Sequence, residues 1–124
     1  WFEHQRLRRL LQNFPAEQIV LIGHSYGAST AAKLVAKGHQ VNLLITLDPV
    51  GWGPVALARI PQYCQHWLNF RAANTKANFA NIVARAGGWW QHAPLDFAHQ
   101  HIDIDADHAL VVSKALTRLV WSAA

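Results

Sequence analysis

Methionine is absent from this sequence of 124 residues, and cysteine occurs once, at Cys64. A single cysteine excludes an internal disulfide framework and does not indicate a compartment, so the localisation stays open. Charged residues make up only 15% of the chain, against 52% hydrophobic residues. Even so, no apolar run approaches the roughly 18 residues of a membrane-spanning helix, and no secretory signal is visible. We therefore expect a globular protein without a transmembrane segment, built as a single domain over residues 1–124.

A strong excess of one charge is lacking as well. The formal net charge is +4, and the basic residues gather only near the start, at Arg6, Arg8 and Arg9. No aromatic–basic stripe and no nucleic-acid-binding motif accompany them. A solvated helix face explains this cluster better than a nucleic acid partner does, and we expect no such partner.

The most informative stretch is residues 19–28, Ile-Val-Leu-Ile-Gly-His-Ser-Tyr-Gly-Ala. Its four consecutive apolar residues predict a fully buried strand, and the small residues after the serine predict a helix. Between them lies a G-x-S-x-G motif with Ser25 at its apex. A serine at the apex of so sharp a turn adopts strained backbone angles, so Gly23 and Gly27 are expected to provide the steric clearance. The helix start would offer backbone N–H groups and a positive dipole end to a developing oxyanion.

The rest of the chain alternates between strand-like and helix-like segments. A strand, a helix and a second strand joined by a crossover of about ten residues predict a right-handed βαβ unit and a parallel sheet. Residues 87–90, Gly-Gly-Trp-Trp, are expected to form a turn with exposed aromatic rings. The fold class is therefore α/β, a mostly parallel sheet flanked by helices. The expected helices cover residues 1–13, 28–37 and 109–121, the strands 18–23, 41–47, 66–70 and 101–106, and the loops 50–61 and 72–81.

Three residues with complementary chemistry each follow a predicted strand: Ser25, Asp48 and His108. A nucleophilic serine needs a base to take its proton and a carboxylate to orient that base. Neighbouring parallel strands lie about 4.8 Å apart, so residues at their carboxyl ends can converge at one edge of the sheet. Two histidines are candidates for the base. We prefer His108, in the loop beyond the last strand, and His101 takes its place if residues 101–106 form a loop.

These motifs resemble the α/β-hydrolase superfamily: the Gly-His-Ser-Tyr-Gly nucleophile elbow, the acid in Leu-Asp-Pro, and a late histidine. The separation of 23 residues between Ser25 and Asp48 (48 − 25) is similar to that of pancreatic-type lipases, whose acid follows the strand after the elbow strand. The resemblance implies a catalytic triad in which Ser25 is the nucleophile, Asp48 the orienting acid and His108 the general base. It also implies that the backbone N–H of Tyr26 is one oxyanion donor.

The resemblance covers only the carboxyl-terminal half of that fold. The strands that precede the elbow are missing, so we expect a fold truncated at its N-terminus, without the loop that supplies the second oxyanion donor. The implied activity is that of a serine hydrolase, similar to an esterase, lipase or thioesterase, which cleaves a small-molecule ester or thioester through an acyl-enzyme and needs no cofactor. His24 and Trp52 are expected to line the substrate site. The open sheet edge would pair with a missing upstream segment or with another copy in an oligomer.

Two interpretations from other classes stay open. The first is a non-catalytic remnant or interaction module, which keeps the elbow as fold architecture and pairs through an exposed apolar edge. The second is a metal-binding protein, because residues 99–108 concentrate histidine and aspartate. No HExxH motif or cysteine pair is present, and strand alternation would place several of these side chains on one solvent face, so we expect no metal site. The residues concerned are His99, His101, Asp103, Asp105 and His108.

Overall fold

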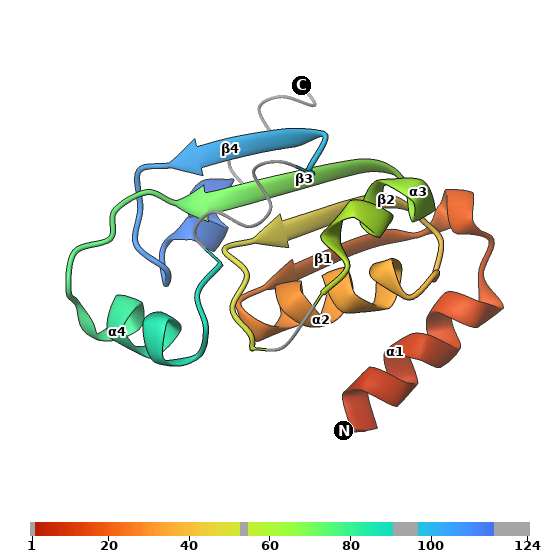
Figure 1. The fold of residues 1–124 in the computed structure, drawn as a ribbon, viewed down its shortest axis with the longest axis horizontal. Helices are drawn as coiled ribbons and strands as arrows, with labels where there is room; N and C mark the ends of the chain where they lie inside the picture. Colours follow the sequence, from red (N-terminus) through yellow and green to blue (C-terminus); the bar gives the residue numbers. More distant parts are fainter. Residues whose placement is uncertain (1, 53–54, 91–96, 116–124) are drawn as a thin grey trace.

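A computed structural model describes residues 2–52, 55–90 and 97–115 of the chain. Four strands of these residues form one sheet in the order β1-β2-β3-β4, and every neighbouring pair is parallel, so all four arrows point the same way in Figure 1. The sheet and its helices place the chain in the α/β class, as predicted. The strands are β1 (Val20–His24), β2 (Val41–Leu47), β3 (Cys64–Ala72) and β4 (Gln100–Ile104).

Helices connect the strands, as a parallel sheet requires. The segment 111–115 is helical too. In the helix predicted for 109–121, residues 109 and 110 form a turn instead, and residues 116–121 lie outside the described residues. Within the described residues, no helix combines the length and the apolar character needed to cross a membrane. The helices are α1 (Phe2–Asn13), η1 (Ala16–Gln18), α2 (Tyr26–Ala36), η2 (Leu57–Arg59), α3 (Ile60–Tyr63) and α4 (Phe79–Ala86).

The sheet separates two hydrophobic clusters. On one face, Leu34 of α2 packs with Leu44 of β2. On the other face, Val111 packs with Ile45 of β2 and Phe70 of β3. Leu44 and Ile45 are consecutive, and successive strand side chains point to opposite faces, so α2 and the helical segment 111–115 lie on opposite sides of the sheet.

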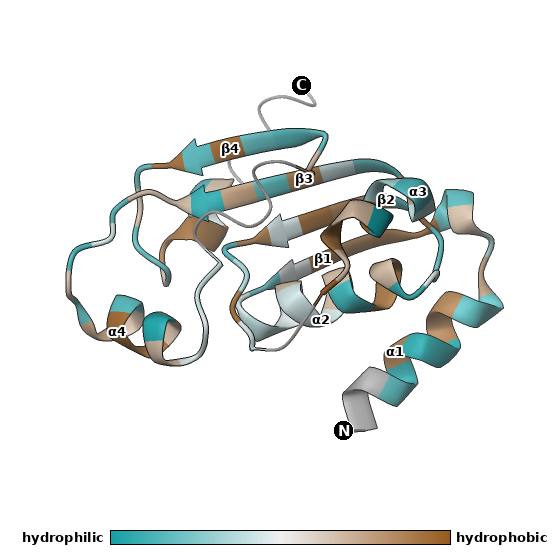
Figure 2. Ribbon diagram, viewed as in Figure 1, coloured by the Kyte–Doolittle hydropathy of each residue, from teal (hydrophilic) through white to brown (hydrophobic). Residues whose placement is uncertain are grey.

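The first strand is not fully buried, so that prediction is wrong. Leu21 is buried under α2, whereas Val20 is 55% exposed and Ile22 is 49% exposed. In the described part of the chain β1 pairs only with β2, and only its α2 face is covered. The unbroken apolar run, which colours β1 mostly brown in Figure 2, is the pattern of a strand covered on both faces.

The predicted loop at 72–81 is also wrong in part, because α4 begins within it at Phe79. The Asn78 side chain caps this helix by accepting a hydrogen bond from the backbone N–H of Asn81. The predicted excursion at 50–61 contains η2 and the start of α3, and Val50 within it is buried and bridges to Trp89. For the segment 72–81, asparagine favours turns and helix caps alike, so composition alone did not distinguish a continuous loop from the start of a helix.

Candidate functional site at the carboxyl ends of the strands

Ser25 occupies the turn between β1 and α2 with φ 59° and ψ −123°, a backbone conformation that side chains rarely adopt. Hydrogen bonds to neighbouring segments hold this turn. The Ser25 N–H donates to the Leu47 carbonyl at 3.0 Å, and the Ser25 carbonyl accepts from the N–H groups of Ala28 and Val50. The serine is thus fixed at the carboxyl end of β1, next to the end of β2.

The two glycines of the motif have different roles. A Cβ at Gly23 would overlap the backbone of Gly27 and Ala28, so the close approach of β1 to α2 requires glycine there. The expectation for Gly27 is wrong, because a Cβ at that position meets no heavy atom within 4 Å. Tyr26 is the first residue of α2, and N–H groups in a first helical turn have no intrahelical acceptor.

Asp48 follows β2 with φ 49°, and its carboxylate is fully buried. Three donors surround it. Its Oδ1 accepts from the Ala72 N–H at 3.0 Å, and its Oδ2 accepts from Trp89 Nε1 at 2.6 Å and from His108 Nδ1 at 2.6 Å. Burying a carboxylate is costly unless it is hydrogen-bonded, and these three bonds compensate that cost.

His108 lies between the other two residues. Its Nδ1 faces Asp48, and its Nε2 is 3.0 Å from Ser25 Oγ. An ionised carboxylate only accepts hydrogen bonds, so the proton of the neutral ring is on Nδ1 and Nε2 accepts from the serine hydroxyl. The structure therefore joins Ser25, His108 and Asp48 in one hydrogen-bonded chain, although they are separated by up to 83 residues in sequence.

Asn81 of α4 holds the backbone of the histidine loop and was not identified from the sequence. Its Oδ1 accepts from the His108 N–H at 2.9 Å, and its Nδ2 donates to the carbonyls of Asn74 and Lys76 at 2.8 and 2.7 Å. The residue is fully buried. The only signal in the sequence was the unusual density of asparagine in this region, which does not specify a partner.

His24, predicted to line the substrate site, contacts His108. The two rings stack with centroids 4.8 Å apart, and His24 Nε2 donates to the His108 carbonyl at 3.0 Å. Burial lowers the pKa of His24; the nearby His108 adds to the lowering, while the hydrogen bond to the His108 carbonyl opposes it. A neutral His24 therefore lies against the ring of His108.

His101 lies on β4, away from the chain of Ser25, His108 and Asp48. Its Nδ1 accepts from the Asn69 amide at 3.1 Å, and its Nε2 donates to Asp103 at 3.0 Å. Asp103 also receives two hydrogen bonds from Arg71. Burial of this carboxylate raises its pKa, but the bonds from Arg71 and His101 outweigh that effect and leave the pKa lowered.

The residues considered for metal binding are dispersed. His99 accepts from the Trp67 N–H, His101 faces Asn69 and Asp103, and His108 lies between Ser25 and Asp48. Among the described residues, no three histidine, cysteine or acidic side chains gather closely enough to hold a metal ion.

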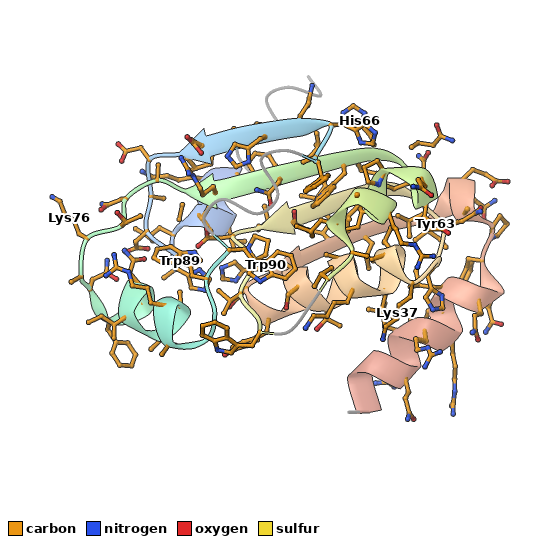
Figure 3. The ribbon with its side chains drawn as sticks, viewed as in Figure 1. Lys37, Tyr63, His66, Lys76, Trp89 and Trp90 are labelled. Atoms are coloured by element: carbon orange, nitrogen blue, oxygen red, sulfur yellow. The ribbon has the colours of Figure 1, made fainter. Side chains whose placement is uncertain are left out.

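The tryptophans of the turn after α4 are not the exposed rings that the sequence suggested. Both are partly buried, and Figure 3 shows them near the carboxyl ends of the strands. Trp89 donates to Asp48, whereas Trp90 donates to the Gly51 carbonyl at 2.8 Å. Trp52 is 71% exposed, and its indole donates to the Ala86 carbonyl.

A cavity of about 470 Å³ lies at the other end of the sheet. It is lined by residues around the starts of β2 and β3, among them Gln40, Tyr63 and His99, and neither Ser25 nor His108 contributes to it. Figure 3 shows Tyr63 at this end, opposite Trp89. Cys64 also lines it, and burial raises the pKa of that thiol to about 11. The cavity is therefore separate from the chain of Ser25, His108 and Asp48.

The fold and the site define an α/β protein with a serine, a histidine and an aspartate in hydrogen-bond contact at the carboxyl edge of a parallel sheet. Comparisons with protein-family models, curated proteins and solved structures found no match to this chain.

Proposed function

We propose that this protein is a serine hydrolase of the α/β-hydrolase type, which cleaves an ester or thioester through an acyl-enzyme on Ser25. The observation that carries the proposal is the continuous contact from Ser25 Oγ through the His108 ring to the buried Asp48 carboxylate. A serine hydroxyl is a weak nucleophile by itself and needs this type of neighbour to become reactive.

In the proposed reaction, Ser25 Oγ attacks the carbonyl carbon of the substrate while His108 Nε2 takes the hydroxyl proton. Asp48 stabilises the imidazolium that forms and keeps the ring oriented. The tetrahedral intermediate collapses, the bond to the alcohol or thiol breaks, and His108 returns the proton to the leaving group. Water, activated by His108 in the same way, then releases the acid and restores Ser25.

The developing oxyanion requires hydrogen-bond donors, and the N–H of Tyr26 at the start of α2 is the donor that we assign. The dipole of α2 favours negative charge at the same point. Loss of a single oxyanion donor typically costs ~10²–10³ in rate, so a second donor is part of the proposed site. The proposed fold supplies it from a segment that precedes the elbow in α/β-hydrolases.

An interaction module is the second candidate function, and the exposed face of β1 favours it. Val20 and Ile22 present apolar surface beside a strand edge that is unpaired within the described residues. Such an edge is a template for a further strand. In the hydrolase proposal this strand belongs to the upstream part of the fold, and in the alternative it belongs to a partner chain.

A fluorophosphonate probe tests the hydrolase proposal. Attack by an activated serine forms an Oγ–phosphorus bond and expels fluoride, while His108 takes the hydroxyl proton. We expect the unaltered chain to be labelled, and Ser25→Ala and His108→Gln to abolish labelling. His101→Gln is the matched control and should label normally, because His101 contacts neither Ser25 nor Asp48 through its ring nitrogens.

A chain that is folded by circular dichroism but unlabelled would contradict the hydrolase proposal. Light scattering would then examine the second candidate, since pairing through β1 predicts an oligomer that Ile22→Lys disrupts. Labelling that is lost in His101→Gln but retained in His108→Gln would reverse the assignment of the base.

A further inference from the structure

Trp89 shares one carboxylate oxygen with the histidine of the site. Its Nε1 donates to Asp48 Oδ2 at 2.6 Å, the same oxygen to which His108 Nδ1 donates at 2.6 Å. The Trp89 ring also meets the His108 ring edge-on, with centroids 5.9 Å apart. The indole of Trp89 therefore contacts both Asp48 and His108. Neither residue is a neighbour of Trp89 in sequence.

The turn that carries Trp89 is itself fixed. Val50, two residues after Asp48, forms an antiparallel bridge with Trp89, and Gly51 N–H donates to the Gly88 carbonyl at 2.8 Å. Gly88 has φ 89°, which favours glycine. The segment after Asp48 and the segment before Trp89 are thus joined, so the indole N–H is held at the carboxylate rather than reaching it by chance.

A donor on Oδ2 has two physical consequences. It fixes the direction of the carboxylate, because Ala72 holds Oδ1 and Trp89 holds Oδ2. It also withdraws negative charge from the oxygen that faces His108, since each hydrogen bond to an anion spreads its charge. Both effects act on the base through the acid, and neither requires contact with a substrate.

We infer that Trp89 is a positioning residue of the proposed hydrolase, which orients Asp48 through its indole N–H and sets how strongly Asp48 stabilises the protonated form of His108. This inference rests on the proposed function. Among the described residues, the charged or titratable groups near this unit include His24, stacked on His108, and Arg85 of α4, above the Trp89 ring. Asp107 is adjacent in sequence, and its carboxylate accepts from Asn78 and from the N–H groups of Ala109 and Leu110.

The chain provides a matched pair for the test. Trp89→Phe removes the N–H and keeps an aromatic ring, and Trp90→Phe makes the same change at the next residue, whose N–H donates to the Gly51 carbonyl instead. The measurement is the second-order rate constant of fluorophosphonate labelling between pH 5 and pH 9, with the folded fraction of each variant determined by circular dichroism.

We expect Trp89→Phe to lower the plateau rate about tenfold, since a hydrogen bond to a charged group is involved. We also expect the midpoint of the acid limb to move to higher pH, because Asp48 then concentrates more negative charge beside His108. Trp90→Phe should stay within about twofold of the unaltered chain, with the same midpoint. The midpoint discriminates because a loss of folded protein lowers the amplitude of the profile without displacing it.

A Trp89→Phe profile that matches Trp90→Phe would overturn the inference. So would a lower rate with an unmoved midpoint, which is the result of a purely structural role. If the unaltered chain is never labelled, the proposed function fails, and the inference fails with it. If the unaltered chain is labelled and only the midpoint prediction fails, the proposed function stands without this role for Trp89.

Discussion

Ser25 and Asp48 share a backbone feature that is rare outside glycine. They are the non-glycine residues with positive φ in the described part of the chain, at 59° and 49°. Such conformations cost on the order of 1–3 kcal/mol each and persist only where the surroundings enforce them. Here the Ser25 N–H donates to Leu47 and the Asp48 N–H to Phe70, so the strand ends fix both residues. The strain coincides with the two residues whose side chains hydrogen-bond to the ring nitrogens of His108.

The neutral state of His24 makes stability dependent on pH. Burial favours the uncharged ring and lowers its pKa below the ordinary value of 6.5, so the unfolded chain takes up this proton at higher pH than the folded chain. The contribution of His24 to stability is therefore present above about pH 6.5 and is lost as the pH falls through the lowered pKa of the folded state.

His24→Gln should reduce this dependence, because glutamine keeps an N–H donor but does not titrate. Urea unfolding at pH 7.5 and pH 5.5 provides the comparison, with the unaltered chain as reference. We expect the free energy of unfolding to fall less between the two pH values in the variant. Equal losses in both proteins would contradict the assigned role of His24.

At the scale of elements, α4 is the support of the histidine loop. Asn78 caps the helix, and Asn81 in its first turn bonds to the backbone of His108, Asn74 and Lys76. A short helix thus connects the loop after β3 to the loop after β4. Figure 1 shows α4 beyond the arrowheads, at the carboxyl end of the sheet.

Asn81→Ala should destabilise the protein by about 3 kcal/mol, because it leaves a buried N–H and two carbonyls without their partner. Asn78→Ala, in the same segment, removes a helix cap and should cost about 1 kcal/mol. Urea denaturation measures both. The expected order is that Asn81→Ala is the more destabilising variant, and the reverse order would show that the cap, rather than the buried amide, holds the segment.

The exposed face of β1 is the other feature at this scale. The run of apolar residues predicted the strand, but it did not show which of the two faces of β1 is covered. The covering of a strand face depends on segments that are distant in sequence. Leu21 is buried and its two neighbours Val20 and Ile22 are not. Periodicity would have distinguished the faces only if the outward residues had been polar.

At the scale of the whole molecule, Cys64 is a reporter of folding. It is the one cysteine of the chain, it is buried, and burial raises its pKa to about 11. The thiolate is the reactive form, and at pH 8 only about one thiol in a thousand is ionised at such a pKa.

We therefore expect Cys64 to react with Ellman's reagent, a disulfide, at least about 100-fold more slowly at pH 8 in native buffer than at pH 8 in 6 M urea. Burial limits the access of the reagent to the thiol, and the raised pKa keeps the thiol protonated. The absorbance of the released thiolate follows the reaction. Rapid labelling in native buffer would mean that the core between α3 and the sheet opens readily in solution.

By itself, the sequence determined the local framework. The apolar runs at 19–22 and 41–47 predicted the strands β1 and β2, and the G-x-S-x-G motif between the first strand and the next helix predicted the serine turn, because these elements depend on short-range sterics and hydrophobic periodicity. The candidate serine, acid and histidine also followed from position, since each lies just beyond a predicted strand.

Only the tertiary structure showed that His108, and not His101, contacts Ser25 and Asp48, that one face of β1 is exposed, and that Trp89 and Asn81 lie beside these residues. These outcomes depend on contacts between residues far apart in sequence, such as His108 with Asn81, 27 positions away, and with Ser25, 83 positions away. The local sequence around a side chain does not specify the distant group that this side chain will contact. Its partner is set by strand order and register, which arise only when the two faces of the whole sheet are packed.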